Sequence, residues 1–194
     1  MSIQEVNRIV EVGKQYAHTV PSRGIFYSWG GDNHLGLTLG GRDEALFSQR
    51  YNQPVGGGSN AGPGLYLSTN LYDSSDYCPA NGGVLLQVDM PDQIPYIDAT
   101  NQQVMNALRS GNPPVNGPML YRNGADKPPI LMKFTNTWLC LKTVRGVGFR
   151  KFDGRAHTVP QIQDALNQLR RLGRNAAVNV LLGQLRTDIR GHIR

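Results

Sequence analysis

The sequence has few cysteines and no long apolar run, and each shortage limits the class of protein. Only Cys78 and Cys140 occur among 194 residues, which is too few and too widely spaced for a metal site. They are most simply two buried thiols, and a disulfide between them is the alternative. No segment has the length and apolar character of a membrane span, and the amino terminus lacks a signal-peptide pattern. We therefore expect no metal cofactor and no membrane span.

Aromatic residues are also scarce, at 8%, whereas the chain has 23 glycines and 12 prolines. This composition favours a β-rich fold with many turns over a helical bundle. A chain of 194 residues can bury one full core but is short for two ordinary domains. We predict a single α+β domain over residues 1–194, with an N-terminal helix at about 1–20 and a C-terminal helical segment at about 158–194.

The C-terminal segment combines a helical pattern with much of the net charge of +6. Pro160 fits the first helical turn after Thr158, and Gly173 interrupts the pattern. Apolar residues recur at helical spacing before that glycine at Ile162, Ala165, Leu166, Leu169 and Leu172. An amphipathic helical hairpin with solvated arginines explains this pattern. The alternative is a basic surface for an acidic partner, and nucleic acid is disfavoured because no aromatic residues interleave and no nucleic-acid motif occurs.

The most informative segment runs from residue 64 to residue 98. A glycine-rich loop comes before it, and such a loop lets the backbone approach a ligand closely. Gly64, Tyr66, Ser74 and Tyr77 then follow in order. This order resembles the nicotinamide-binding half of the ADP-ribosyltransferase superfamily, in the pattern of the poly(ADP-ribose) polymerases. The resemblance implies that Tyr66 shapes the nicotinamide site, that the Ser74 hydroxyl binds the nicotinamide amide, and that Tyr77 stacks on the ring.

A second alignment resembles the bacterial toxin-like mono-ADP-ribosyltransferases. It places Ser68, within Leu67-Ser68-Thr69, on that family's Ser-Thr-Ser strand. The family's apolar strand, proline and Tyr-Ile-Asp segment correspond to residues 84–91 and 96–98, and we expect the latter to form a turn. The two alignments remain alternatives, and together they cover roughly residues 23–148.

The first strand of the family, here residues 25–30, departs from both patterns. Polymerase-like members have a histidine that binds the adenosine ribose, but this sequence has Ser28 or Trp29 at the candidate positions. Toxin-like members have an Arg-Gly pair, for which Arg23 and Gly24 are available. The Arg23 guanidinium suits the phosphates of NAD+ because it can pair with them through two hydrogen bonds. We expect His34, in the polar loop that follows, to be a surface residue.

The resemblance supplies no catalytic glutamate. The family uses this acid to stabilise the positive charge that develops as nicotinamide leaves. Thr137 takes its position in the polymerase-like alignment and Pro129 takes it in the toxin-like alignment. Asp126 is the nearest acid and is our candidate catalytic residue. All three glutamates of the chain lie upstream of the motif, at Glu5, Glu11 and Glu44.

The resemblance implies an ADP-ribosyltransferase-like fold of two packed antiparallel sheets around a cleft, with flanking helices. It also implies a mono-ADP-ribosyltransferase-like domain that uses NAD+ as substrate if active, modifies a host or cellular protein, and has an altered active site. Such a domain would be secreted into a host cell, with a role in virulence, if it is a bacterial effector, and would otherwise be cytoplasmic. The alternative is a non-catalytic partner-binding module that retains the fold.

Overall fold

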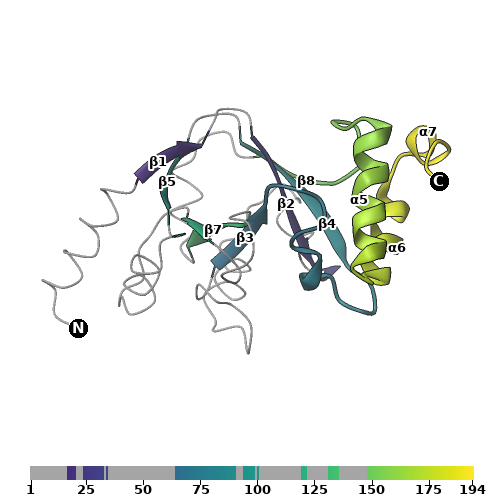
Figure 1. Cartoon of the computed structure of the whole chain (residues 1–194), viewed down its shortest axis with the longest axis horizontal. Helices are drawn as coiled ribbons and strands as arrows, with labels where there is room; N and C mark the ends of the chain where they lie inside the picture. Colours follow the sequence, from purple (N-terminus) through teal and green to yellow (C-terminus); the bar gives the residue numbers. More distant parts are fainter. Residues whose placement is uncertain are drawn as a thin grey trace, which may run out of the picture. The chain divides into compact units, whose positions relative to one another are not determined.

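The protein is mixed α/β, with an antiparallel sheet and three helices among the described residues (Figure 1). It divides into two compact units. Unit 1 contains residues 1–24, 43–67 and 90–147, and unit 2 contains residues 25–42, 68–89 and 148–194. The computed structural model describes residues 17–20, 24–32, 34, 64–90, 94–98, 100, 119–121, 131–135 and 148–194. The prediction of a single domain stays a prediction.

Unit 1 is built from short strands. Strand β1 pairs with β5 in antiparallel register, β5 pairs with β6 in parallel, and β6 pairs with β7 in antiparallel register. The parallel pair departs from the predicted antiparallel arrangement. The bounds of these strands are β1 Ala17–Val20, β5 Ile94–Asp98, β6 Met119–Tyr121 and β7 Leu131–Thr135.

One local prediction is wrong in unit 1. Residues 96–98, expected as a turn, are the end of β5. Strand β1 takes the last four residues of the segment of about 1–20 that was assigned to the N-terminal helix, and the helix stays a prediction because residues 1–16 lie outside the described part. Residues 96–98 are extended because they pair with β1, where His18 lies opposite Tyr96. Pairing with a distant strand outweighs weak local preferences in segments this short.

Unit 2 places helices against a sheet. Neighbouring strands of this unit follow the order β2-β4-β8, and Ser68 lies opposite Tyr27 of β2. The strand bounds are β2 Gly24–Gly30, β4 Val84–Met90 and β8 Gly148–Lys151. Strand β3, Gly64–Ser68, belongs to unit 1 except for its last residue. The helix bounds are α5 Val159–Arg171, α6 Asn175–Gln184 and α7 Thr187–Arg190. All three helices lie within the segment predicted to be helical, and among the described helices none is long and apolar enough to cross a bilayer.

Helix α5 begins and ends at local signals. The Thr158 hydroxyl accepts from the Gln161 N–H and the Gln161 side chain accepts from the Thr158 N–H, which is a capping box. At the other end Gly173 adopts a φ of 68°, and the Arg174 N–H donates to the Leu169 carbonyl at 2.9 Å. This Schellman-type ending satisfies carbonyls that the last turn would leave unpaired. The chain can therefore turn directly into α6.

The core of unit 2 lies between the sheet and the helices α5 and α6 (Figure 1). Tyr27 and Trp29 reach it from one face of β2, since side chains two residues apart in a strand share a face. Leu172, the last of the apolar residues at helical spacing, is 54% exposed, because it follows the last turn of α5. The buried members are Tyr27, Trp29, Leu71, Leu85, Phe152, Ile162, Ala165, Leu166, Leu169, Ala177, Val178, Leu181 and Leu185.

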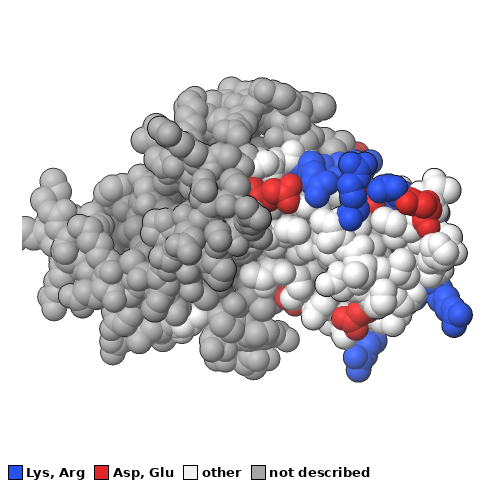
Figure 2. Space-filling view, turned by 90° about the horizontal axis from the view of Figure 1, so that it is seen from above, with Lys and Arg blue, Asp and Glu red and all other residues white. Residues whose placement is uncertain are grey.

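Four arginines of this unit, Arg150, Arg155, Arg174 and Arg186, form ion pairs with acidic residues. Figure 2 shows Lys and Arg side chains gathered in one area of the described surface, with Asp or Glu side chains beside them. Ion pairs join Arg150 to Asp89 at 3.1 Å and Arg186 to Asp188 at 2.6 Å. Pairs this exposed each contribute only about 0–1 kcal/mol to stability.

Candidate functional site

Four of the six predicted site residues lie in the described part of the chain, and three of them, Ser68, Ser74 and Tyr77, belong to unit 2. Tyr66 is partly buried within β3, Ser68 ends that strand, and Ser74 and Tyr77 lie on the connection to β4. We call residues 69–78 the signature turn. The structure thus brings the polymerase-like pair Ser74 and Tyr77 together. Arg23 and Asp126 lie outside the described residues, as do Thr137 and Pro129.

The backbone of the signature turn is fixed by a single asparagine. The Asn70 Oδ1 atom accepts from the N–H groups of Tyr72, at 3.1 Å, and Asp73, at 2.9 Å. The Ser68 hydroxyl donates to the Asn70 carbonyl at 2.6 Å, so this predicted ligand-binding hydroxyl already has a partner in the protein. Asparagine is favoured in such turns because its side chain can replace a backbone acceptor. The chain then enters the short helix η2, Ser75–Tyr77.

Two contacts attach the turn to the rest of unit 2. Leu71 is buried in the helix-facing core, and the Trp29 indole N–H donates to its carbonyl at 2.8 Å. Asp76 forms an ion pair with Arg174, the residue that precedes α6. The turn is therefore held both from β2 and from the start of α6.

Three consecutive residues of this turn carry buried polar atoms without partners. These atoms are Asp73 Oδ2, Ser74 Oγ and Ser75 Oγ, and they are half of the six such atoms found in the described residues. Ser74 is 1% exposed and Ser75 is 2% exposed. Buried polar groups in folded proteins almost always have hydrogen-bond partners, and leaving one unpaired costs about 1–3 kcal/mol. Their concentration here marks the turn as a place where a ligand or water completes the hydrogen bonds.

The acidic and aromatic side chains of the turn differ in setting. Burial raises the pKa of the Asp73 carboxyl to about 6. The Tyr77 ring is 39% exposed, and burial, with a further contribution from Asp76, raises the pKa of its hydroxyl. Tyr77 therefore keeps its proton at neutral pH and offers an aromatic surface next to the buried serines in sequence.

His34, which follows β2, is buried, although the sequence predicted a surface residue. His34 is only 9% exposed, and its Nε2 atom lies 3.2 Å from the Ser28 hydroxyl. A Cβ atom on Gly30 would lie 2.3 Å from the His34 ring, so the ring packs on the backbone where the absence of a side chain leaves room. The expectation for His34 is wrong because this contact across six residues was not visible in the local sequence.

Of the two first-strand candidates, Trp29 is committed to the core. It is 2% exposed and belongs to the helix-facing cluster, whereas Ser28, its neighbour in the strand, points to the opposite face of β2. Ser28 with its partner His34 is therefore the better candidate for a polar role in β2.

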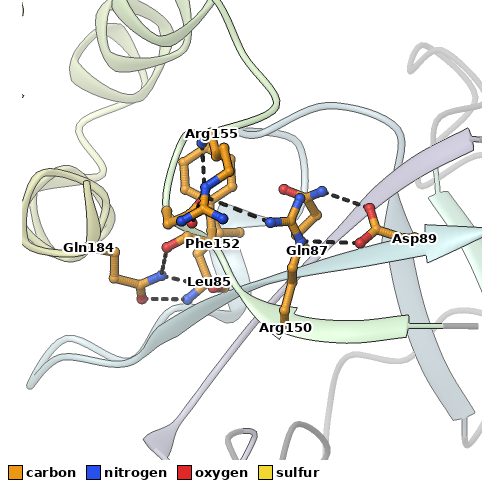
Figure 3. A network of polar contacts seen from close by, with 8 residues as sticks. Leu85, Gln87, Asp89, Arg150, Phe152, Arg155 and Gln184 are labelled. Carbon is orange, nitrogen blue, oxygen red and sulfur yellow. Dashed lines mark hydrogen bonds and ion pairs between the residues drawn. The ribbon is translucent and has the colours of Figure 1, made fainter. Parts of the chain in front are cut away.

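A second polar cluster lies on the helix-facing side of the sheet (Figure 3). The Gln87 amide donates to Asp89 at 2.7 Å, and Asp89 also accepts from Arg150. A hydrogen bond joins the Tyr27 hydroxyl to His157 Nε2. Burial, with a smaller effect of Asp89, raises the pKa of Tyr27 to about 12, while burial and then Arg150 lower the pKa of His157. These shifts keep both side chains neutral near pH 7.

Sequence reasoning missed Asp73 and Ser75, although they stand directly beside Ser74 in the motif. Their burial without partners is what distinguishes them, and no sequence pattern signals that.

Within the residues that the structure describes, no group of three or more His, Cys, Asp or Glu side chains is arranged to hold a metal ion. Comparison with known protein families and with curated proteins finds no match to this chain.

Proposed function

We propose that this chain is a mono-ADP-ribosyltransferase-like domain that binds NAD+ at the signature turn and has an altered active site. The observation that carries the proposal is the Ser74 hydroxyl, buried and without a partner on a braced turn that also presents Tyr77. In the resemblance these two side chains bind the nicotinamide amide and ring. A hydroxyl held in place before the ligand arrives loses little conformational entropy on binding.

The positions of the strands along the sequence support the same proposal. Strands β2 and β3 occupy segments that both alignments require to be extended, and so does β4, which ends at Met90 before Pro91. Strand β7, Leu131–Thr135, begins two residues after Pro129, which the toxin-like alignment places at the glutamate position. The proposed fold is that of the ADP-ribosyltransferases, with two packed sheets around a cleft, and the parallel pairing of β5 with β6 is a departure from the antiparallel pattern expected for it.

The proposed active site is altered because neither alignment provides the glutamate. Asp126 is the proposed substitute, and Arg23 would hold the phosphates of NAD+. In the wider proposal NAD+ is the substrate, no metal takes part, and the acceptor is a side chain of a host or cellular protein. A bacterial effector of this kind would act inside a host cell after secretion.

Calorimetric titration with NAD+ tests the binding step, and a nicotinamide-release assay tests the chemistry. Binding that is lost in a folded Ser74→Ala variant supports the site. A wild-type chain that does not bind NAD+ at millimolar concentration contradicts it.

The second candidate function is a non-catalytic module that retains the fold and binds a protein partner. Thr137 and Pro129 at the two glutamate positions favour it, because neither side chain can carry the negative charge that the reaction needs. NAD+ binding without nicotinamide release would select this function, and release well above background would exclude it.

A further inference from the structure

Residues 79–82 form a second turn, which follows the signature turn and leads into β4. The Gly82 N–H donates to the Pro79 carbonyl at 3.1 Å, and Asn81 stands directly before this glycine. Asn81 is exposed, and within the described residues its side chain makes no hydrogen bond. Its carboxamide is therefore open to water and can rotate toward the backbone nitrogen that follows it.

Gly82 leaves the space around that backbone nitrogen open. It adopts a φ of 104°, and a Cβ atom placed on it would have no atom within 4 Å apart from its chain neighbours. Glycine tolerates this backbone conformation because it has no side chain. Asparagine is among the thermolabile residues of proteins, since the next backbone nitrogen can attack its side-chain carbonyl carbon and close a succinimide ring. The Asn81–Gly82 pair presents both reacting groups without a side chain between them.

Asn70 has the opposite setting earlier in the same β3–β4 connection. Its Oδ1 atom accepts from the N–H groups of Tyr72, at 3.1 Å, and Asp73, at 2.9 Å. The residue that follows it, Leu71, is buried in the helix-facing core. Both the carboxamide and the next peptide group are therefore held in place. The fold distinguishes one asparagine that is fixed from one, Asn81, that is open.

One contact opposes ring closure at Asn81 in the folded protein. The hydrogen bond from the Gly82 N–H to the Pro79 carbonyl must open before the nitrogen can attack. A single neutral hydrogen bond corresponds to about 2-fold to 12-fold in an equilibrium constant. This turn therefore slows the reaction within that range and does not prevent it.

We propose that Asn81 is a site of spontaneous covalent modification, at which the folded protein loses a side-chain amide to water. The Gly82 nitrogen bonds to Asn81 Cγ, and the side-chain nitrogen takes up the proton that this backbone nitrogen gives up and leaves as ammonia. One water molecule then opens the ring. Opening at Cγ gives aspartate, and opening at the backbone carbonyl gives isoaspartate, in which the main chain runs through the former side chain. Either product adds one negative charge, and neither depends on NAD+ binding.

The isoaspartate product strains the structure after the turn. A Cβ atom on Gly83 would lie 2.4 Å from the Gly30 carbonyl oxygen and 2.9 Å from Pro79 Cδ, so the backbone here packs directly on β2. Isoaspartate adds one carbon to the main chain just before this contact. The longer chain must displace either Gly83 or the start of β4. We therefore expect isoaspartate at position 81 to lower the melting temperature of the protein.

Peptide mass spectrometry tests the proposal on the full chain. The protein is incubated at pH 8, both folded and unfolded in guanidinium chloride, and the conversion of each asparagine to an acid is followed after digestion. In the folded protein we expect conversion at Asn81 at a rate no more than about 12-fold below that of the unfolded chain. Asn70 should keep its amide over the same time in the folded protein. The rate at Asn81 should rise with pH, because the attacking nitrogen must lose its proton.

Two variants serve as controls. Asn81→Gln should remove the conversion at this position and keep the wild-type melting temperature, because the longer side chain closes a larger ring much more slowly. Asn81→Asp carries the charge of the products but keeps the length of the main chain. Labelling by an isoaspartyl methyltransferase identifies the isoaspartate form, which should melt below Asn81→Asp.

Each outcome decides a part of the proposal. Conversion at Asn81 in the folded protein, with Asn70 intact, supports it. A folded-state rate more than about 12-fold below the unfolded rate would overturn it, because more than one turn contact would then protect Asn81. Equal conversion of Asn70 and Asn81 in the folded protein would overturn the structural distinction between them. An isoaspartate form that melts with Asn81→Asp would overturn the expected strain.

Discussion

The Gln184 side chain at the end of α6 forms hydrogen bonds with the sheet backbone, as the backbone of a neighbouring strand would. The Gln184 Oε1 atom accepts from the Leu85 N–H at 2.9 Å, and its amide donates to the carbonyls of Leu85 at 2.9 Å and Phe152 at 3.1 Å (Figure 3). Leu85 is fully buried. The Leu85 carbonyl also accepts from the Phe152 N–H at 3.0 Å, whereas its N–H depends on Gln184.

Gln184→Leu keeps the approximate volume and removes all three hydrogen bonds. An unpaired buried Leu85 N–H costs about 1–3 kcal/mol, and the two other bonds contribute about 0.5–1.5 kcal/mol each. Added apolar burial offsets about 1 kcal/mol. We therefore expect the free energy of unfolding to fall by about 3 kcal/mol, with a melting temperature lower by about 6–12 °C for a chain of this size.

Urea denaturation followed by circular dichroism measures the free energy, and hydrogen exchange at the Leu85 amide reports the local effect. Gln163→Leu is the control, because Gln163 on α5 makes its hydrogen bonds at the surface, and it should change stability by less than about 1 kcal/mol. Gln184→Glu should be destabilised at neutral pH and recover on acidification, since a protonated carboxyl can again donate to a carbonyl. A Gln184→Leu variant within about 0.5 kcal/mol of the wild type would refute this account of α6 docking.

Three further predictions concern the site and the pH response. Tyr77→Ala should weaken NAD+ binding by about 0.5–1.5 kcal/mol in calorimetry, because the partly exposed ring would lose its stacking contact. Wild-type nicotinamide release should stay near background even at high enzyme concentration, since loss of one transition-state interaction costs about two to three powers of ten in rate. The stability of the wild type relative to His157→Asn should fall as the pH drops through about 6.5, measured by urea denaturation across pH 5–8. The pKa of His157 is lowered in the folded state, so the unfolded chain binds the proton more tightly and is favoured at low pH.

For each of these three predictions, a specific result would contradict it. Ser68→Ala is the paired test for Tyr77→Ala, and the variant with the larger effect on NAD+ affinity selects the alignment. Robust turnover would contradict the altered-site argument, and Asp126→Asn should then abolish it if the acid has moved to that loop. A stability difference between wild type and His157→Asn that is constant across the pH range would show that His157 titrates normally in the folded protein.

The sequence by itself was sufficient where the determining interactions are local. Strand β4 and helix α5 are found where predicted, because an apolar run ending before Pro91 and a Thr158 capping signal act within a few residues. The Gly-x-Tyr, Ser and Tyr order singled out this segment from the sequence, and its role as a binding site stays a prediction. The same local reasoning failed for residues 96–98, which are extended because β5 pairs with β1.

Only the tertiary structure decided which polar side chains are buried and whether they have partners. The sequence separation is 99 residues between Gln184 and Leu85 and 130 residues between Tyr27 and His157. No periodicity or spacing encodes contacts over such distances. Asp73 shows what the sequence alone does not predict, because the sequence gives its residue type and position but not its burial. Its desolvation and its unpaired oxygen arise from the surrounding fold, because the strength of a hydrogen bond or a charge depends on exclusion of water by residues far away in the chain.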